Sequence, residues 1–296
     1  MLEDKLGNTI LENIHEAVDF AVSWAVNEID SKYNSKNLFF YHNQSHTKQV
    51  LERVNSMSRS LASVHTNLFF EHNFFLVKLA AAFHDINFIT EIENDKIIKI
   101  GVKSEESSAI MAEEFMLEIN DYFFANRFLQ LFSQKDIDTV KTAILATQPG
   151  ITLNNLYKPN ITSDSSIESI LMVLADLGSA GTDSQRYLLE GDMLWLEGNT
   201  KLAKGILEPT TLTEKEMENY VLELKNWRSY EVQFAISLKE IFADILRLLP
   251  NNEAKVIGEF YNQFDNSISL AKKMVLESEN LTFEKIIEDL EKYIER

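Results

Sequence analysis

Residues 67–88 read NLFFEHNFFLVKLAAAFHDINF, and this stretch decides the fold. Its apolar side chains would cover almost the whole circumference of a helix, which is typical of a helix buried on all sides. The apolar run is too short to cross a bilayer, which takes about 20 residues. We therefore predict a central helix enclosed by others, with His84 and Asp85 at its C-terminal end.

The rest of the chain supplies the helices that would enclose it. Only 9 Gly and 4 Pro among 296 residues leave few turn formers for an all-β chain. Apolar residues at helical spacing predict a helix from Asn8 to about Tyr33, with Asn8 or Thr9 as its cap. A second helix is expected over residues 43–62. Further helices are expected over residues 104–118, 121–132, 135–147 and 165–178, and on both sides of Pro250. The predicted fold class is all-α, a helical bundle with a helical C-terminal extension.

Two polar segments separate these helices and are interpreted as loops near a functional site. They cover about residues 89–103 and 148–166, and the second is long enough to border a substrate. Residues 1–208 are predicted to form the catalytic domain. Residues 209–296 contain no histidine and carry many Glu and Lys, so we interpret them as an extension that packs on that domain or mediates association.

Charge and composition exclude several classes of protein. A net charge of −18 repels phosphate backbones and anionic lipid headgroups, so neither nucleic acid nor membrane is an expected partner. A small phosphorylated ligand stays compatible with this charge, because a bound cation can reverse the potential inside one cleft. Cysteine is absent, so any metal must bind nitrogen and oxygen. The chain starts without a basic, then apolar, signal-like segment and has no membrane-spanning run, so a cytoplasmic protein is expected.

Histidine is scarce enough for each position to be weighed. The six histidines are His15, His42, His46, His65, His72 and His84. We interpret His15, His65 and His72 as surface or capping residues. His84 differs, since it follows a buried helix and precedes an acid, and a buried carboxylate needs a partner or a cation. An isolated His-Asp dipeptide is nevertheless more often a capped helix end with an ordinary hydrogen bond.

Further elements, in a particular order, favour a metal site. They are YHNQSHTKQV at 41–50, LAAAFHDINF at 79–88, SEESSAIMAEEF at 104–115 and VLADLG at 173–178. Over about residues 36–190 the chain thereby resembles the HD superfamily of metal-dependent phosphohydrolases, and most of all the compact bacterial proteins described as predicted HD-superfamily phosphohydrolases. The resemblance implies that one divalent ion is held by His46, His84, Asp85 and Asp176. Nitrogen and carboxylate ligands suit Mn²⁺, Co²⁺, Fe²⁺, Ni²⁺ or Zn²⁺.

The resemblance also implies an activity, the hydrolysis of a phosphate ester or anhydride in a small molecule, a nucleotide first of all, by a metal-activated water. Asp85 would contact both ion and water, and Glu105 would orient the water. Lys48 and Arg186 are the candidate phosphate contacts. His42, four residues before His46, is expected to support a ligand by hydrogen bonding rather than to bind the ion.

Departures from the family pattern keep other hypotheses open. No histidine lies between Asp85 and Asp176, which disfavours the dinuclear branches, including the di-iron oxygenases and the cyclic-nucleotide phosphodiesterases. Ile86 and Asn87 stand where guanosine tetraphosphate hydrolases have Glu-Asp. Ser104 and the sequence at 147–150 also depart from the closest subgroup. The main alternative is a metal-binding module without turnover that serves ligand sensing or protein interaction, and a homo-oligomer is left open.

Overall fold

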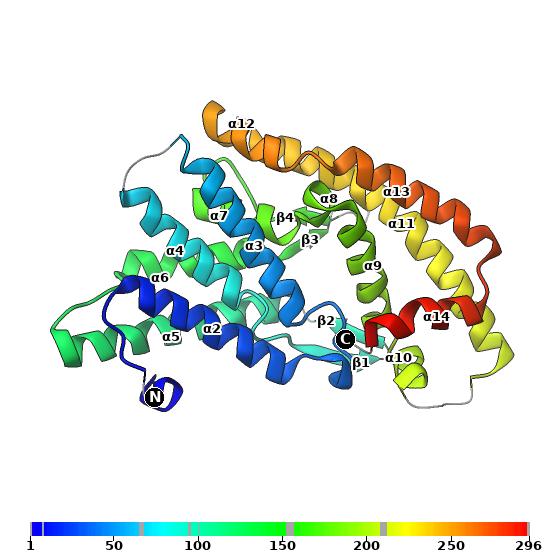
Figure 1. Cartoon of the computed structure of the whole chain (residues 1–296), viewed down its shortest axis with the longest axis horizontal. Helices are drawn as coiled ribbons and strands as arrows, with labels where there is room; N and C mark the ends of the chain where they lie inside the picture. Colours follow the sequence, from blue (N-terminus) through cyan, green and yellow to red (C-terminus); the bar gives the residue numbers. More distant parts are fainter. Residues whose placement is uncertain are drawn as a thin grey trace.

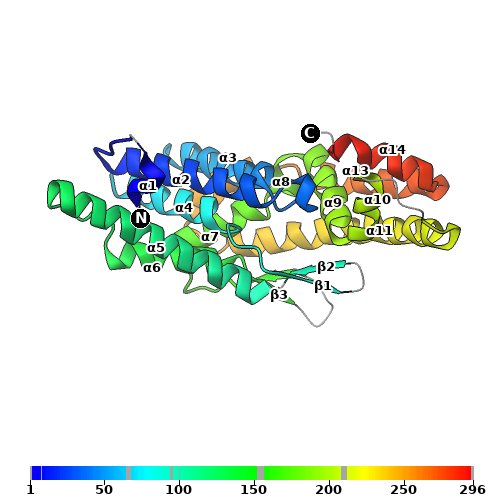
Figure 2. The same ribbon diagram turned by 90° about the horizontal axis from the view of Figure 1, so that it is seen from below.

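The structure is a computed structural model, and most of its described residues are helical. It describes residues 2–7, 9–64, 68–93, 96–99, 101–151, 157–207 and 212–294. The strands among them form two short antiparallel hairpins. The predicted all-α class is confirmed. The molecule is long and flat (Figures 1 and 2). The C-terminal third, in yellow, orange and red in Figure 1, runs along one long side and extends beyond the earlier helices at one end.

The elements follow the chain in a simple order. The helices of the first two thirds are α1 (Leu2–Leu6), α2 (Ile14–Lys32), α3 (Gln44–Leu61), α4 (Leu68–Phe83), α5 (Gly101–Arg127), α6 (Gln134–Ala146), α7 (Ile167–Asp176), α8 (Ser179–Thr182), α9 (Ser184–Gly198) and α10 (Thr200–Leu207). The C-terminal third adds α11 (Glu214–Leu246), α12 (Asn251–Phe260), α13 (Phe264–Glu277) and α14 (Phe283–Ile294). Short elements are the strands β1 (Thr90–Glu93), β2 (Lys96–Lys99), β3 (Pro149–Ile151) and β4 (Tyr157–Pro159), and the 3-10 helices η1 (Ser35–Asn37) and η2 (Ser278–Asn280).

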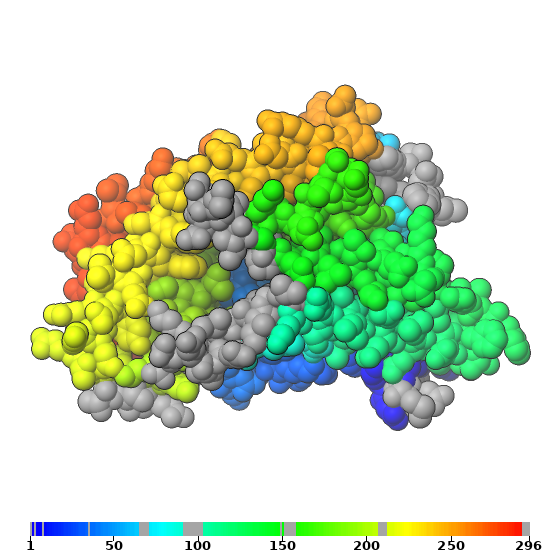
Figure 3. All heavy atoms as spheres, turned by 180° about the vertical axis from the view of Figure 1, so that it is seen from behind, coloured from blue at the N-terminus to red at the C-terminus, as the bar shows by residue number. Residues whose placement is uncertain are grey.

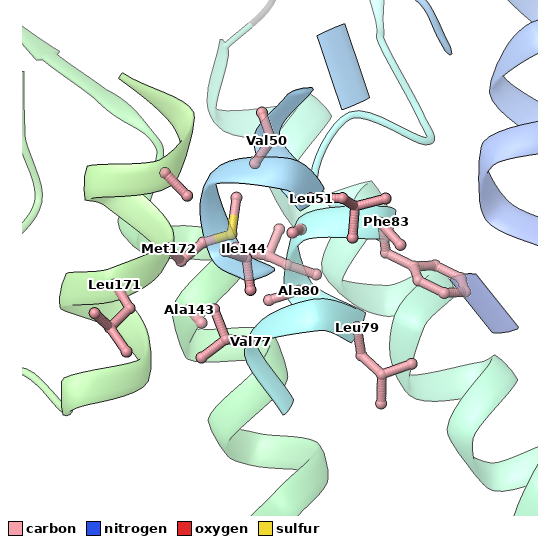
Figure 4. Close-up of a cluster of buried hydrophobic side chains, with 14 of the residues drawn as sticks. Val50, Leu51, Val77, Leu79, Ala80, Phe83, Ala143, Ile144, Leu171 and Met172 are labelled. Carbon is pink, nitrogen blue, oxygen red and sulfur yellow. The ribbon is translucent and has the colours of Figure 1, made fainter. Parts of the chain in front are cut away.

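The apolar helix α4 lies at the centre of the first bundle, as its sequence indicates. It packs against α2, α3, α5, α6 and α7. Its residues from Val77 to Phe83 are fully buried except for the half-buried Lys78. Figure 4 shows its side chains among those of α3, α6 and α7. Because α4 is covered on all sides, the residues that follow Phe83 emerge inside the protein rather than at its surface.

The start of α2 differs from the prediction. The helix begins at Ile14 with Asn13 as its cap, whereas the predicted cap at Asn8 or Thr9 is wrong. The Asn13 side chain accepts the N–H of Glu16, and the Glu16 carboxylate accepts the N–H of residue 12. This pair satisfies one open backbone donor of the first turn, the N–H of Glu16, and ties the residue before the cap to the same turn, so it fixes the boundary here.

The two helices predicted over residues 104–118 and 121–132 are in fact the single helix α5. It continues to Arg127 and stops where Phe128 takes a left-handed backbone conformation, with φ of 54°. The polar Asn120 does not break the helix. Its buried side chain accepts the N–H groups of residues 131 and 132, which anchors the returning chain against α5.

Both predicted loops contain strand pairs. In the first, β1 pairs with β2 in the register Thr90 with Lys99. In the second, β3 pairs with β4, and Gly150 lies opposite Lys158. A Cβ at position 150 would come within 2.6 Å of the Lys158 carbonyl oxygen, so the close approach of the strands requires glycine there.

The C-terminal helices share the main hydrophobic core with the first bundle. Buried residues of α11, α12 and α13 belong to the same cluster as those of α2–α7. A second, smaller cluster joins α9, α10, α11 and α14 to Leu38 and Phe40. The predicted division at residues 208 and 209 falls outside the described residues and stays a prediction. Among the described residues, none of the helices combines the length and apolar character that crossing a membrane requires.

Candidate metal centre

His84 and Asp85 lie directly after α4, inside the protein. His84 is only 2% exposed. Its Nδ1 lies 2.9 Å from the carbonyl oxygen of Ala81, so Nδ1 carries the proton and donates it to that oxygen. The other ring nitrogen, Nε2, is thereby left to face the neighbouring side chains. The end of the apolar helix thus orients this imidazole so that Nε2 could bind an ion.

His46 reaches the same place from the first turn of α3. That turn is capped by Asn43, whose side chain accepts the N–H groups of Ser45 and His46 at 2.8 and 3.3 Å. The predicted start of this helix is confirmed. His46 is 3% exposed, and its ring centroid lies 5.5 Å from that of His84.

Asp176 is the last residue of α7 and completes the group that the sequence predicted. Its Oδ1 lies 3.2 Å from His46 Nε2 and 3.5 Å from His84 Nε2. Asp85 Oδ2 lies 3.1 Å from His84 Nε2 and 3.8 Å from His46 Nε2. The structure therefore brings together all four predicted ligands.

These distances suit a metal ion. Nitrogen and oxygen ligands about 2.1 Å from one ion lie about 3.0–3.4 Å apart when neighbours subtend 90° to 109°. Three of the four separations are close to that range. His46, His84 and Asp85 each offer a ligand atom within 4.8 Å of the others and are buried. This group could hold a metal ion.

The electrostatics of the group also favour a cation. Burial alone would lower the pKa of the His84 imidazole, but the carboxylates of Asp85 and Asp176 outweigh it and raise that pKa well above its usual value. Burial would raise the pKa of Asp176, whereas hydrogen bonds from His46 and His84 bring it well below its usual range. His84 Nε2 is buried, with Asp85 Oδ2 at 3.1 Å and Asp176 Oδ1 at 3.5 Å. A buried ring nitrogen that faces two carboxylate oxygens in this way fits a metal ligand.

His42 lies beside the ligands but is paired with another residue. Its Nδ1 lies 2.5 Å from Oε1 of Glu197 on α9, and its ring centroid is 6.3 Å from that of His46. The other oxygen of Glu197 accepts the backbone N–H groups of Phe40, Tyr41 and His42 at 2.9–3.1 Å. One buried carboxylate thus holds the whole turn that leads into α3.

Sequence reasoning missed Glu197, Tyr41 and Glu190. The Tyr41 ring lies 4.5 Å from the His46 ring. Burial raises its pKa well above the usual value, and the charges of Glu190 and Asp176 raise it further, so its hydroxyl keeps its proton. The segment SQRYLLEGDMLWLEG offered one signal, since acids recur there among large apolar residues that must be buried.

The predicted phosphate contacts lie in different surroundings. Arg186 is half-buried, and its guanidinium donates to Gln49 Oε1 at 2.7 Å, to Ser45 Oγ at 3.0 Å and to Glu190 Oε1 at 3.2 Å. It therefore lies against the turn that carries His46. Lys48 is exposed and donates to Gln44 Oε1 at 2.7 Å.

Glu105 is buried near the start of α5, with 2% of its surface exposed. The same turn of α5 is fastened to the chain that follows Asp85. Ser104 Oγ accepts the N–H of Ile89 at 2.9 Å, and Ser108 Oγ accepts the N–H of Asn87 at 3.2 Å. Ser104, one of the departures from the family pattern, thus has a structural role here.

The remaining histidines contact other residues. His15 is exposed, packs on Phe75 and lies 3.8 Å from a Glu71 oxygen. His72 lies 2.9 Å from Asp136 Oδ1 at the start of α6. His65 lies outside the described residues.

Two cavities adjoin α9, and Arg186 lines both. One, of about 390 Å³, is also lined by Arg53 and Arg59 of α3. The other, of about 770 Å³, lies among α9, α11, α13 and α14. On the face seen in Figure 3, the surface is hollowed between α11, in yellow, and the green helices, and blue atoms from the early part of the chain lie inside the hollow.

Comparisons with family models, with curated proteins and with solved structures give no match for this chain.

Proposed function

We propose that this chain is a metal-dependent phosphohydrolase of the HD type that acts on a small phosphorylated molecule, with nucleotides as the first class to examine. One observation carries the proposal. Side-chain atoms of His46 on α3, of His84 and Asp85 directly after α4, and of Asp176 on α7 lie 3.1–3.8 Å apart in the four measured pairs. Their order along the chain is that of the family's ligands, as its sequence resemblance implies.

The ligand chemistry narrows the choice of ion. Two imidazoles and two carboxylates suit one Mn²⁺, Co²⁺, Fe²⁺, Ni²⁺ or Zn²⁺. Bound there, the ion would lower the pKa of a water molecule and neutralise charge that develops on a phosphoryl group. Hydrolysis of a phosphate ester or anhydride is the reaction that uses both effects.

The protein's own groups would divide the remaining work. Asp85 would contact both the ion and the attacking water, because its carboxylate is one of the four proposed ligands. Glu105, buried on the helix fastened next to Asp85, would orient that water. His42 would stay outside the ligand set, since Glu197 already engages its Nδ1 and fixes the ring beside His46. Tyr41 would add a hydroxyl donor at the same side.

Arg186 is the better supported of the two phosphate contacts. It lies beside the His46 turn and lines a cavity with two further arginines. Three arginines against the carboxylates of Glu52 and Asp183 would make this cavity less negative than the chain as a whole, which suits an anionic substrate. Lys48 remains the second proposed contact, from the exposed side of α3.

The proposal is tested by measuring metal content and turnover on the same samples. Wild-type protein should bind one ion per chain and release phosphate or pyrophosphate from a panel of nucleotides and sugar phosphates with added Mn²⁺. Asp85→Ala should abolish release. His84→Ala and Asp176→Ala should lose most of the metal, whereas the matched His15→Ala, far from the ligands, should keep it.

Two results would count against the proposal in different ways. Stoichiometric metal retained in both His84→Ala and Asp176→Ala would overturn the ligand assignment. One bound ion with no turnover across the panel would instead favour the alternative hypothesis of a metal-binding module that serves sensing or protein interaction.

A further inference from the structure

The backbone that carries Asp176 is held by two side chains from distant parts of the sequence. The last four carbonyl groups of a helix lack partners within that helix. At the end of α7, the carbonyl oxygen of Leu174 accepts the hydroxyl of Tyr261 at 2.7 Å. The next carbonyl, of Ala175, accepts Nε of Arg53 at 2.5 Å, and that of Asp176 lies 3.4 Å from Nη2 of the same guanidinium.

Both side chains are buried and press on the turn that follows Asp176. A Cβ at Gly178 would lie 2.6 Å from Tyr261 Cε1 and 3.0 Å from Arg53 Cδ. It would also lie 2.5 Å from the carbonyl oxygen of Leu174. Glycine at this position therefore allows the two side chains to reach the helix end at all. The contacts of Tyr261 and Arg53 with the end of α7 therefore depend on the absence of a side chain at Gly178.

The residues after Tyr261 continue the same attachment. The N–H of Gln263 donates to the carbonyl oxygen of Gly181 at 2.8 Å, and Ser267 Oγ donates to that of Ala180 at 2.7 Å. α12 packs on α3, and α13 packs on α8 and α9. Figure 1 shows α12 and α13 running along the side of the molecule that carries α3 and α8. The C-terminal third therefore touches the chain on both sides of the Asp176 carboxylate.

We propose that Tyr261 and Arg53 are positioning residues for Asp176, so that the junction of α12 and α13 is part of the metal centre. This inference rests on the proposed metal site. Neither residue touches the ligand atoms; each fixes the backbone of α7 from which the Asp176 side chain extends. Side chains that support metal ligands change metal affinity by about 10–100-fold when they are replaced. Tyr261 and Arg53 exert this control through carbonyl groups.

The test compares two buried tyrosines whose hydroxyls each donate a hydrogen bond to a backbone carbonyl oxygen. Tyr261→Phe removes the hydrogen bond to Leu174 next to the metal ligand. Tyr187→Phe removes a 2.6 Å hydrogen bond from a buried tyrosine to the carbonyl oxygen of Glu231, away from the ligands. For each full-length variant, Co²⁺ affinity is measured by titration, the visible spectrum of bound Co²⁺ is recorded, and the urea midpoint of unfolding is determined.

Arg53→Lys serves as the second variant, since lysine keeps the charge but cannot span two carbonyl groups. Its control is Arg228→Lys, because Arg228 is also buried and donates to Ser278 Oγ at 2.8 Å. A lysine at either position faces a similar loss of contacts. Only Arg53→Lys should change the affinity for Co²⁺.

We expect Tyr261→Phe and Arg53→Lys to weaken Co²⁺ binding by about tenfold or more and to shift the Co²⁺ spectrum. The two control variants should lose a similar amount of stability and keep wild-type affinity and spectrum. Wild-type affinity and spectrum in both test variants would overturn the inference while leaving the metal site standing. Absence of stoichiometric Co²⁺ or Mn²⁺ binding by the wild type would overturn the proposed function and the inference with it.

Discussion

Glu197 offers a sharp test of how the site is assembled, because one side chain satisfies three backbone donors and one imidazole. Glu197→Ala leaves the N–H groups of Phe40, Tyr41 and His42 without their acceptor in a largely buried place. A buried donor left without a partner costs about 1–3 kcal/mol. Three such donors predict a loss of at least about 3 kcal/mol, a large share of the 5–15 kcal/mol that stabilises a typical domain.

Glu197→Gln should have a smaller effect. Its amide oxygen can still accept the three N–H groups, while its NH₂ group replaces the oxygen that engages His42. The expected loss is one hydrogen bond of a charged group, about 1.5–3 kcal/mol. Turnover should fall with metal content unchanged, because Glu197 contacts the turn before α3 and His42 rather than the ligands.

Urea unfolding of the full chain measures the losses, and Glu218→Ala, an exposed acid on α11, is the control. A loss below about 1 kcal/mol for Glu197→Ala, similar to a surface substitution, would refute the reasoning from unsatisfied donors. Loss of metal in Glu197→Gln, as in Asp176→Ala, would show that Glu197 acts on the ligand set itself.

Two further predictions concern charged groups on α9 and α11. Burial, with the charge of Asp192, raises the pKa of Glu231 well above its usual value, so the folded chain binds this proton more tightly than the unfolded chain does. The free energy of unfolding should therefore fall by about 1.4 kcal/mol per pH unit from about pH 4.3 up to the pKa of Glu231 in the folded chain. Urea unfolding at a series of pH values measures this slope. Glu231→Gln should remove the slope, whereas the exposed Glu240→Gln should keep it. Arg186→Ala should raise the KM for a phosphorylated substrate at least tenfold, as a lost charged hydrogen bond implies. Lys48→Ala should raise it less, and steady-state kinetics that rank the two in the reverse order would reassign the phosphate contact.

The parts of the site that lie next to one another in sequence could be predicted from it. The apolar run of α4 placed His84 and Asp85 at a buried helix end, and Asn43 marked the start of the helix that carries His46. In both cases the interactions that set the helix boundary join residues within about four positions of each other in the sequence. The position of Asp176 rested on the order of motifs, and the structure brings its carboxylate to the same two imidazoles.

The contacts that hold these ligands could not be predicted in the same way. Glu197 lies 155 residues from His42, and Tyr261 lies 87 residues from Leu174. The sequence around Glu197 or Tyr261 does not indicate which residue is its hydrogen-bond partner. Any buried acid or tyrosine needs a partner, so the residue type alone does not identify it. The two errors in helix boundaries have a more local origin. Asn13 pairs with Glu16 and caps α2 in place of the predicted Asn8 or Thr9. Asn120 does not break α5, because its side chain accepts the N–H groups of residues 131 and 132.

The placement of His84, Asp85 and Asp176 at helix ends favours a bound cation, whatever the reaction. Asp176 is the last residue of α7, and His84 and Asp85 follow the last residue of α4. The C-terminal end of a helix carries a partial negative charge, which adds to the two carboxylates here. Arg53 offsets only the α7 end, where its guanidinium lies on the carbonyl groups of residues 175 and 176. The negative charge that remains in this buried place needs compensation, either by protons on the imidazoles or by a metal ion. The raised pKa of His84 reflects compensation by a proton. An enzyme and a silent metal-binding module would share this requirement, so metal binding alone supports the site, and turnover decides between the two functions.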